Sequence, residues 1–145
     1  MLKTIAVVYW SGTGNTKSMA EAVAAGAAAD GIEVKLWSVD EASLNDVVQA
    51  DGIALGCPSM GSEVLEESEM EPFVAALEAN VAGKPVVLFG SYGWGDGQWM
   101  RDWAERMEAA QAKLPAEGLI QQDAPDAACE EACKELGGKL AAAIA

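Results

Sequence analysis

Serine, threonine and glycine residues cluster near the start of the chain, in the stretch YWSGTGNTKS at residues 9–18. The stretch follows a β-branched run and precedes a series of helix-forming residues. Hydroxyl groups and backbone N–H groups at the start of a helix bind a phosphate dianion well, because the helix dipole also favours negative charge there. The same hydroxyls could instead only cap the helix. The stretch therefore predicts a phosphate site, with a simple helix cap as the alternative.

Two common nucleotide-binding loops share part of this sequence, and both fail at particular residues. A Walker loop requires the pattern G-x-x-x-x-G-K-[ST], but Thr16 stands in place of its second glycine and Gly12 lies one residue too close. A dinucleotide loop requires G-x-G-x-x-G, but Lys17 replaces the third glycine. In addition, Glu33 opens the second strand, whereas the acid that binds a ribose ends it. The sequence therefore favours a phosphate monoester rather than ATP or a dinucleotide.

Apolar runs and helix-forming stretches alternate along the chain. The expected strands are residues 3–9, 32–38, 52–57, 85–91 and 118–122. The expected helices are residues 15–29, 43–50, 69–80, 98–112 and 126–145. This alternation predicts an α/β protein, a doubly wound parallel sheet with helices on both faces. The length of 145 residues predicts one domain over residues 1–145.

The loops that follow the first, third and fourth strands are the most unusual stretches of the sequence. They comprise residues 10–15, 58–67 and 91–98. Ligands bind doubly wound sheets beyond the carboxyl ends of the strands, so we expect the functional site where these loops meet. Trp99 and Trp103 lie four residues apart on one helix and are expected in the core instead. Cys57 ends a buried strand and is expected to be a small apolar filler.

The charge balance is strongly acidic, with 9 basic and 23 acidic residues and a net charge of -14. Such a surface repels nucleic acids and anionic membranes and favours basic partners. We find no signal peptide and no apolar run long enough to cross a bilayer, and three cysteines do not make a disulfide framework. A reduced, cytoplasmic protein is therefore expected. Cys129 and Cys133 are four residues apart, but the chain has no histidine, so no metal site is expected.

Three loop motifs together resemble the flavodoxin family, in particular its short-chain, clostridial type. The motifs are SGTGNT after the first strand, GCPSMGSEVLEESEMEPF after the third and GSYGWGDGQWMRDW after the fourth. The resemblance covers nearly the whole chain and implies a five-stranded sheet in the order 2-1-3-4-5. It further implies bound flavin mononucleotide (FMN) and a monomeric electron carrier rather than an enzyme. By the same resemblance, the carrier shuttles between the semiquinone and the hydroquinone at low potential, transferring electrons between redox enzymes in place of ferredoxin.

The resemblance also implies which residues contact FMN. The phosphate would be held by Ser11, Thr13, Gly14, Asn15 and Thr16. Trp10 and Gly12 of the same loop are also expected to contact the cofactor, although Trp10 could have only the structural role of closing the loop. Ser59 and residues 91–93 (Ser91, Tyr92 and Gly93) are expected near the ribityl chain and the ring edge.

The remaining implied contacts concern the flavin ring. Met60 is expected against its inner face, Trp94 stacked on its outer face, and Glu63 is expected to accept a hydrogen bond from the ring N3–H. The Gly61–Ser62 peptide is the expected switch, whose carbonyl turns toward N5 once that atom is protonated. Glycine suits a peptide that must reorient, because it tolerates positive φ.

Several alternatives stay open at this point. The main one is an FMN-dependent NAD(P)H oxidoreductase. A signalling receiver domain shares the winding but needs an aspartate at the end of the third strand, where Gly56 and Cys57 stand. A low-molecular-weight phosphatase needs C-x5-R, which is not present. Apart from Glu63, the acids of EVLEESEME could be only a solvated helix start, and Pro115 leaves the register of the last strand undefined.

Overall fold

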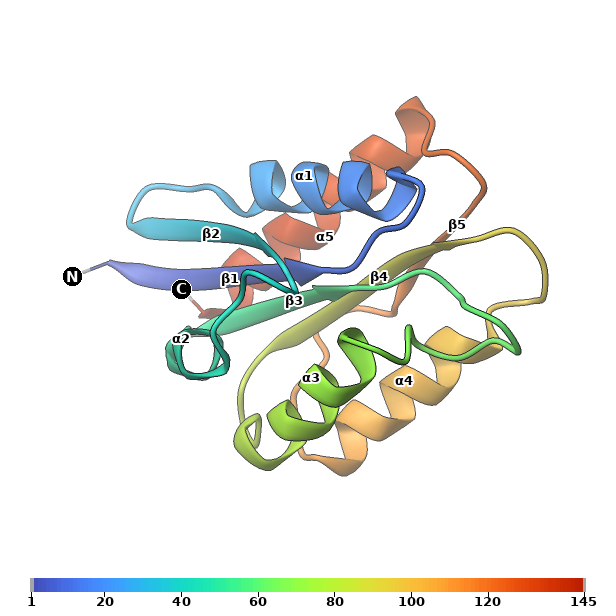
Figure 1. Ribbon diagram of the computed structural model, residues 1–145. Helices are drawn as coiled ribbons and strands as arrows, with labels where there is room; N and C mark the ends of the chain where they lie inside the picture. The colour runs from blue at the N-terminus through green and yellow to red at the C-terminus, as the bar shows by residue number, and fades with distance from the viewer. Residues whose placement is uncertain (1, 145) are drawn as a thin grey trace.

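The computed structural model describes residues 2–144 and consists of a central parallel sheet between two layers of helices (Figure 1). The strands are β1 (Lys3–Tyr9), β2 (Ile32–Ser38), β3 (Gly52–Gly56), β4 (Val86–Tyr92) and β5 (Leu119–Gln122). The helices are α1 (Asn15–Ala27), α2 (Leu44–Gln49), α3 (Met70–Leu77), the short 3-10 helix η1 (Glu78–Asn80), α4 (Gln98–Ala109) and α5 (Ala127–Ile144). The strand order is β2-β1-β3-β4-β5, and every pair is parallel. The predicted α/β fold class and strand order are therefore confirmed.

The strand pattern follows the position of each strand in the sheet. Residues 5–8 in β1 are completely buried, because β1 lies between β2 and β3 and is covered on both faces. By contrast, β2 has no fully buried residue and is a mixture of half-buried and exposed positions, as expected of an edge strand. The observed β1 and β2 coincide with the predicted ranges. The predicted helix over residues 98–112 ends at Ala109 instead, since Gln111 has a left-handed backbone with φ of 69°.

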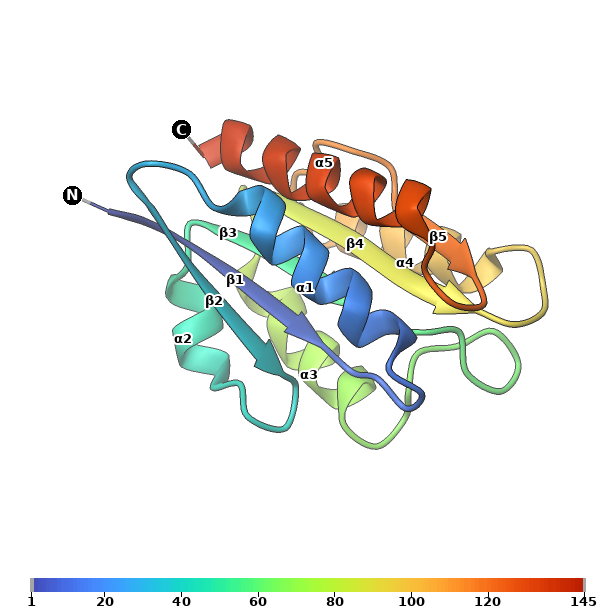
Figure 2. The ribbon, with the colours of Figure 1, turned by 90° about the horizontal axis from the view of Figure 1, so that it is seen from above.

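The two faces of the sheet carry different helices. Helices α1 and α5 lie side by side over one face, and α2, α3 and α4 cover the other (Figure 1, Figure 2). Large side chains fill the second face, where Trp99 and Trp103 of α4 are 2% and 1% exposed. The prediction that these two tryptophans belong to the core is confirmed, as is the burial of Cys57. Arg106 of α4 forms ion pairs with Glu71 of α3 and Glu78 of η1, which link these helices.

Small residues allow α1 and α5 to approach each other closely. A Cβ atom added to Gly26 of α1 would lie 2.0 Å from the carbonyl oxygen of Lys134. A Cβ atom added to Gly137 of α5 would lie 2.1 Å from the carbonyl oxygen of Val23. Any larger residue at either position would therefore separate the two helices.

Because the strands are parallel, their carboxyl ends all face the same end of the sheet, on the right in Figure 1. The register places Tyr9 beside Gly56, and Tyr92 beside Gln122. Pro115 lies in the connection before β5, so it does not interrupt the strand. None of the helices within residues 2–144 is long and apolar enough to cross a membrane.

Candidate functional site

A cavity of about 340 Å³ lies beyond the carboxyl ends of the strands. Its wall is formed by Trp10, Ser11, Gly12, Thr13, Asn15, Thr16, Pro58, Ser59, Met60, Ser91, Tyr92, Gly93 and Asp123. The three loops singled out in the sequence therefore do meet at one site. Of the predicted site residues, the cavity wall does not include Gly14, Gly61, Ser62, Glu63 and Trp94.

The end of the cavity formed by residues 10–16 presents the start of α1. Gly14 adopts a left-handed backbone with φ of 99° immediately before the helix, and its N–H donates to Ser11 Oγ over 3.1 Å. No side-chain hydrogen bond caps α1, and its first turn contains no acidic residue. The first N–H groups of α1 and the hydroxyls beside them therefore form an electropositive end of the cavity.

Thr16 connects this loop to β4. Its side chain is 1% exposed, and Thr16 Oγ1 lies 3.0 Å from Ser91 Oγ, which is also buried. The Thr16 hydroxyl is thus shared with Ser91 rather than left free, although either oxygen can donate the hydrogen. This buried contact fixes the first turn of α1 against the end of β4.

Residues 60–64 form a short turn at the opposite side of the cavity, which we call the 60s hairpin. Met60 and Val64 exchange two backbone hydrogen bonds of 2.9 Å across it. Two of its residues have left-handed backbones, Gly61 with φ of 49° and Glu63 with φ of 56°. Glycine adopts such a backbone without strain, whereas Glu63 does not.

The Glu63 side chain lies against the start of α4. Its Oε1 accepts hydrogen bonds from the N–H groups of Gly97, at 3.2 Å, and Gln98, at 3.0 Å. A Cβ atom added to Gly95 would lie 2.5 Å from the Glu63 carboxyl carbon, so the close approach depends on that glycine. Glu63 therefore links the 60s hairpin to the loop over residues 93–97, and its contact with a flavin ring stays a prediction.

Glu66 has a role that the sequence did not indicate. Its side chain is 8% exposed, and its two carboxylate oxygens accept from the N–H groups of Ser68, Glu69 and Met70 over 2.7–3.0 Å. Burial alone would raise the pKa of this carboxyl, but the three backbone donors outweigh it and hold the pKa below its ordinary value. Glu66 is thus a buried cap of α3, and the alternative of a solvated helix start is wrong for this residue.

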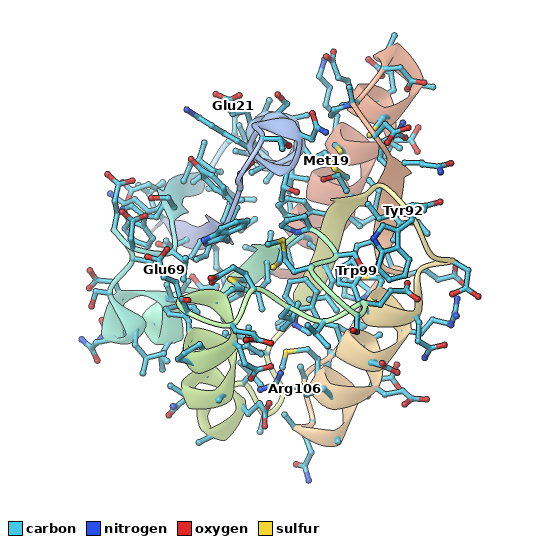
Figure 3. The ribbon with its side chains drawn as sticks, turned by 45° about the vertical axis from the view of Figure 1, so that its right-hand side comes forward. Met19, Glu21, Glu69, Tyr92, Trp99 and Arg106 are labelled. Atoms are coloured by element: carbon cyan, nitrogen blue, oxygen red, sulfur yellow. The ribbon has the colours of Figure 1, made fainter. Side chains whose placement is uncertain are left out.

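Aromatic side chains lie beside the cavity and at its edge. Tyr92 lines it and packs against Trp99, with ring centroids 5.6 Å apart and a tilt of 50° (Figure 3). Trp94 follows the lining residue Gly93 and is 64% exposed. Val64 of the 60s hairpin is 42% exposed. Exposed apolar side chains of this size suit contact with a planar ring or with another protein.

The sequence did not indicate Asp123 in the cavity wall, and it indicated Pro58 only as part of the loop over residues 58–67. Asp123 directly follows β5, has φ of 60° and donates its N–H to the carbonyl of Tyr92 over 2.8 Å. The rule that ligands bind at carboxyl ends of strands would have pointed to it. The last strand was too weakly defined in the sequence for its end to be located.

Within residues 2–144, a second cavity, the cysteines and the potential metal ligands were also compared with this site. A larger cavity of about 520 Å³ lies between α4 and the segment before β5, but no serine or threonine lines it. The three cysteines are free, and burial raises the pKa of Cys57 and of Cys133 to about 12. Among the described residues, no three His, Cys, Asp or Glu side chains are grouped to hold a metal ion.

Comparison with known proteins agrees with this arrangement. A family model described as Flavodoxin matches residues 7–136. The flavodoxin of Clostridium beijerinckii is 48% identical over 135 residues, which cover 93% of this chain and 97% of the relative. The solution structure of two-electron reduced Megasphaera elsdenii flavodoxin superimposes with a TM-score of 0.85 at 45% identity, covering 95% of this chain and 98% of that one. A flavodoxin from the domain Archaea superimposes with a TM-score of 0.89 at 31% identity, covering 97% and 98% of the two chains.

Proposed function

Because the chain belongs to the flavodoxin family and is therefore an FMN-containing electron carrier, we propose that the cavity beyond the strand ends holds this FMN. The phosphate lies against residues 11–16, and the ring lies between the 60s hairpin and Trp94. Bound FMN supplies a redox centre that exchanges single electrons, and the chain supplies no catalytic group of its own.

The uncapped start of α1 is the observation that carries this proposal. A phosphate dianion needs several donors, and the N–H groups of the first turn, together with Ser11 and Thr13, offer them at the end of the cavity. The wall there contains no Lys or Arg, and the first turn holds no acid. These residues therefore fit a phosphate that is bound by neutral donors and the helix dipole.

The ring end is supported by the types of residue present. Met60 in the cavity wall offers a polarisable thioether, and Trp94 beside it offers an exposed indole. The Gly61–Ser62 peptide lies in a turn that the Met60–Val64 pair closes. Gly61 has a φ of 49°, and glycine can take up either sign of φ, so this peptide can reorient without the strain of a side chain. We propose that this rotation offers the flavin a carbonyl acceptor in one redox state only.

The surface near the cavity supports basic redox proteins as partners. Acidic residues there include the exposed Glu67 and Asp123, whereas Asp96 is paired with Arg101, and Val64 and Trp94 add exposed apolar side chains. Not every acid of the run is available for docking, because Glu66 caps α3. The net charge of -14 would also oppose addition of a second electron and so favour a low potential. A monomer in the reducing cytoplasm suits the three free thiols.

FMN and riboflavin binding to the flavin-free chain test the proposed site. Titration followed by flavin fluorescence is expected to show one FMN per chain and an affinity for riboflavin at least about 100-fold weaker, because riboflavin lacks the charge-assisted contacts. Equal affinities would contradict a phosphate site at the start of α1. The alternative, an NAD(P)H oxidoreductase, is tested by mixing the loaded protein with NADPH alone. The absorbance of oxidised flavin is expected to persist, and rapid bleaching would favour the oxidoreductase.

A further inference from the structure

The side chain of Trp10 lies between the phosphate end of the cavity and α3. It lines both the cavity of about 340 Å³ and a neighbouring one of about 290 Å³. The indole ring packs on the backbone of Gly12, since an added Cβ there would lie 3.1 Å from Trp10 Cη2. The Trp10 backbone N–H donates to the carbonyl of Gly56 at the end of β3. Trp10 is therefore held in two ways: its indole ring packs on Gly12, and its backbone is bonded to the end of β3.

The indole N–H of Trp10 reaches across to the start of α3. Trp10 Nε1 donates to Glu69 Oε1 over 3.2 Å, which joins residues 59 positions apart in the chain. Figure 3 labels Glu69 at the beginning of α3, near the loop end of β1. We call this contact the Trp10–Glu69 link. A second, buried contact joins Thr16 at the start of α1 to Ser91 in β4.

Glu69 is connected in turn to the 60s hairpin. Its backbone N–H donates to Glu66 Oε1 over 2.7 Å, and Glu66 N–H lies 3.4 Å from the Cys57 sulfur at the start of the same loop. Only Leu65 separates Glu66 from Val64, whose backbone closes the hairpin. Hydrogen bonds therefore join Trp10 to Glu69 and Glu69 to Glu66, and the chain itself, through Leu65, connects Glu66 to the hairpin.

We propose that Trp10 is a positioning residue that couples the phosphate loop to the 60s hairpin through its bond to Glu69. This inference rests on the proposed FMN site. An anion at the start of α1 would order the backbone at Gly12, on which the indole packs, and thereby favour the bond to Glu69. Coupling is reciprocal, so an ordered hairpin would also tighten binding of the phosphate. The competing interpretation is that Trp10 is only part of the cavity wall.

The coupling is measurable with two separate ligands in place of FMN. Riboflavin carries the ring without the phosphate, and inorganic phosphate supplies the anion alone. In the full-length flavin-free chain, saturating phosphate is expected to tighten riboflavin binding roughly threefold to tenfold, the worth of one net hydrogen bond. The Trp10→Phe variant keeps the ring but removes the N–H, and is expected to bring this ratio close to one.

Two variants of the acceptor separate the link from charge and from packing. Glu69→Ala removes the acceptor at a position on the surface, so it tests the link even if Trp10→Phe folds poorly. Glu69→Gln keeps an acceptor oxygen but loses the charge, and is expected to retain most of the phosphate effect. Trp37→Phe serves as the matched control, because this indole lies on β2, away from the cavity wall. It is expected to behave as wild type.

The outcomes distinguish the link from the site on which it rests. Hydrogen exchange of the wild-type chain with and without phosphate is expected to slow at residues 12–18 and also at residues 60–70. Slowing at residues 12–18 alone, or an unchanged phosphate effect in Trp10→Phe and Glu69→Ala, overturns the link but leaves the phosphate site intact. No slowing at residues 12–18 overturns the phosphate site and the link with it.

Discussion

The crossing of α1 and α5 and the 60s hairpin both depend on glycine, but for different physical reasons. At the crossing, Gly26 and Gly137 allow two backbones to touch, and an added Cβ would lie 2.0–2.1 Å from a carbonyl oxygen. In the hairpin, Gly61 has open space around an added Cβ, but its φ of 49° lies where other residues are strained. The crossing lacks space for a side chain, whereas the hairpin restricts backbone conformation.

Because of this difference, we expect substitutions at the crossing to affect stability and substitutions in the hairpin to affect function. Gly26 and Gly137, where α1 and α5 touch, are not in the cavity wall, so disturbing the crossing should affect folding. The hairpin lies at the cavity, where Met60 is part of the wall, so a change in its backbone preference should affect the flavin. Substitutions can therefore be paired so that each distinguishes a contact from a conformation.

The largest effect is expected for Gly137→Ala. Its new Cβ would lie 2.1 Å from Val23 O and 2.7 Å from Ala27 N, and backbone atoms cannot move aside as a flexible side chain can. We expect a loss of about 3 kcal/mol in the free energy of unfolding, measured in urea on the flavin-free chain. The potentials of bound FMN should not change in the protein that remains folded.

Gly138→Ala is the matched control in the same helix. Its Cβ would meet only the Gly26 carbonyl oxygen, at 3.8 Å. Alanine is the better helix former, so this variant should gain up to about 1 kcal/mol. If both variants lost stability equally, the crossing would not be limited by contact, and the comparison with the hairpin would fail.

Gly61→Val in the 60s hairpin is expected to have the next largest effect. A β-branched residue at a left-handed φ is strained, so the observed backbone should become less favourable by about 2 kcal/mol. The peptide that reorients would then no longer favour one redox state of FMN. Redox titration should show the two one-electron potentials closer together by roughly 60 mV or more, since 59 mV corresponds to about 1.4 kcal/mol for one electron.

Gly83→Val provides the control for strain without proximity to FMN. Gly83 also has a left-handed backbone, with φ of 77°, and open space around an added Cβ, but it lies in the turn before β4. It should lower stability to a similar extent and leave both potentials unchanged. Shifted potentials in Gly83→Val would show that general destabilisation, and not the hairpin, sets the potentials.

The Glu66 cap is expected to make part of the stability depend on pH, unlike the crossing. Folding lowers the Glu66 pKa, so its carboxylate stabilises the folded state above the unfolded value near 4.5. That contribution is lost as the pH falls through the lowered value of the folded state. Glu66→Gln should cost about 1 kcal/mol at pH 7, and the difference from wild type should shrink on acidification below pH 4.5. The Gly137→Ala loss should be independent of pH over the same range, because no charge is involved.

Urea unfolding at several pH values measures this difference. Glu67→Gln is the neighbouring control, since Glu67 is exposed and should show little change at either pH. A Glu66→Gln deficit that stayed constant with pH would mean that its carboxylate does not carry the cap. The start of α3 would then resemble the crossing in owing no stability to this charge.

The sequence predicted what depends on local pattern. The ranges of β1 and β2, the burial of Trp99 and the meeting of three loops at one end of the sheet all followed from periodicity and strand order. Features that depend on distant residues were not predicted. Nothing in the sequence indicates that Gly137 touches Val23, or that Trp10 reaches Glu69, because these contacts require the packed helices and loops. Glu66 and Glu67 are identical neighbours, yet only Glu66 turns inward.

The smallest effect is expected for an exposed charge that contributes to the packing of neither the α1–α5 crossing nor the 60s hairpin. Glu67→Gln should leave stability and both potentials unchanged, but should slow electron transfer to a basic c-type cytochrome by less than about twofold at low salt. The effect should disappear near 0.5 M salt, where the Debye length falls to roughly 4 Å. Glu21→Gln removes an equal charge from α1, on a part of the surface away from the 60s hairpin (Figure 3), and should change the rate less. Stopped-flow rates at several salt concentrations measure this, and equal effects of the two variants would mean that net charge, rather than the surface around the hairpin, steers the partner.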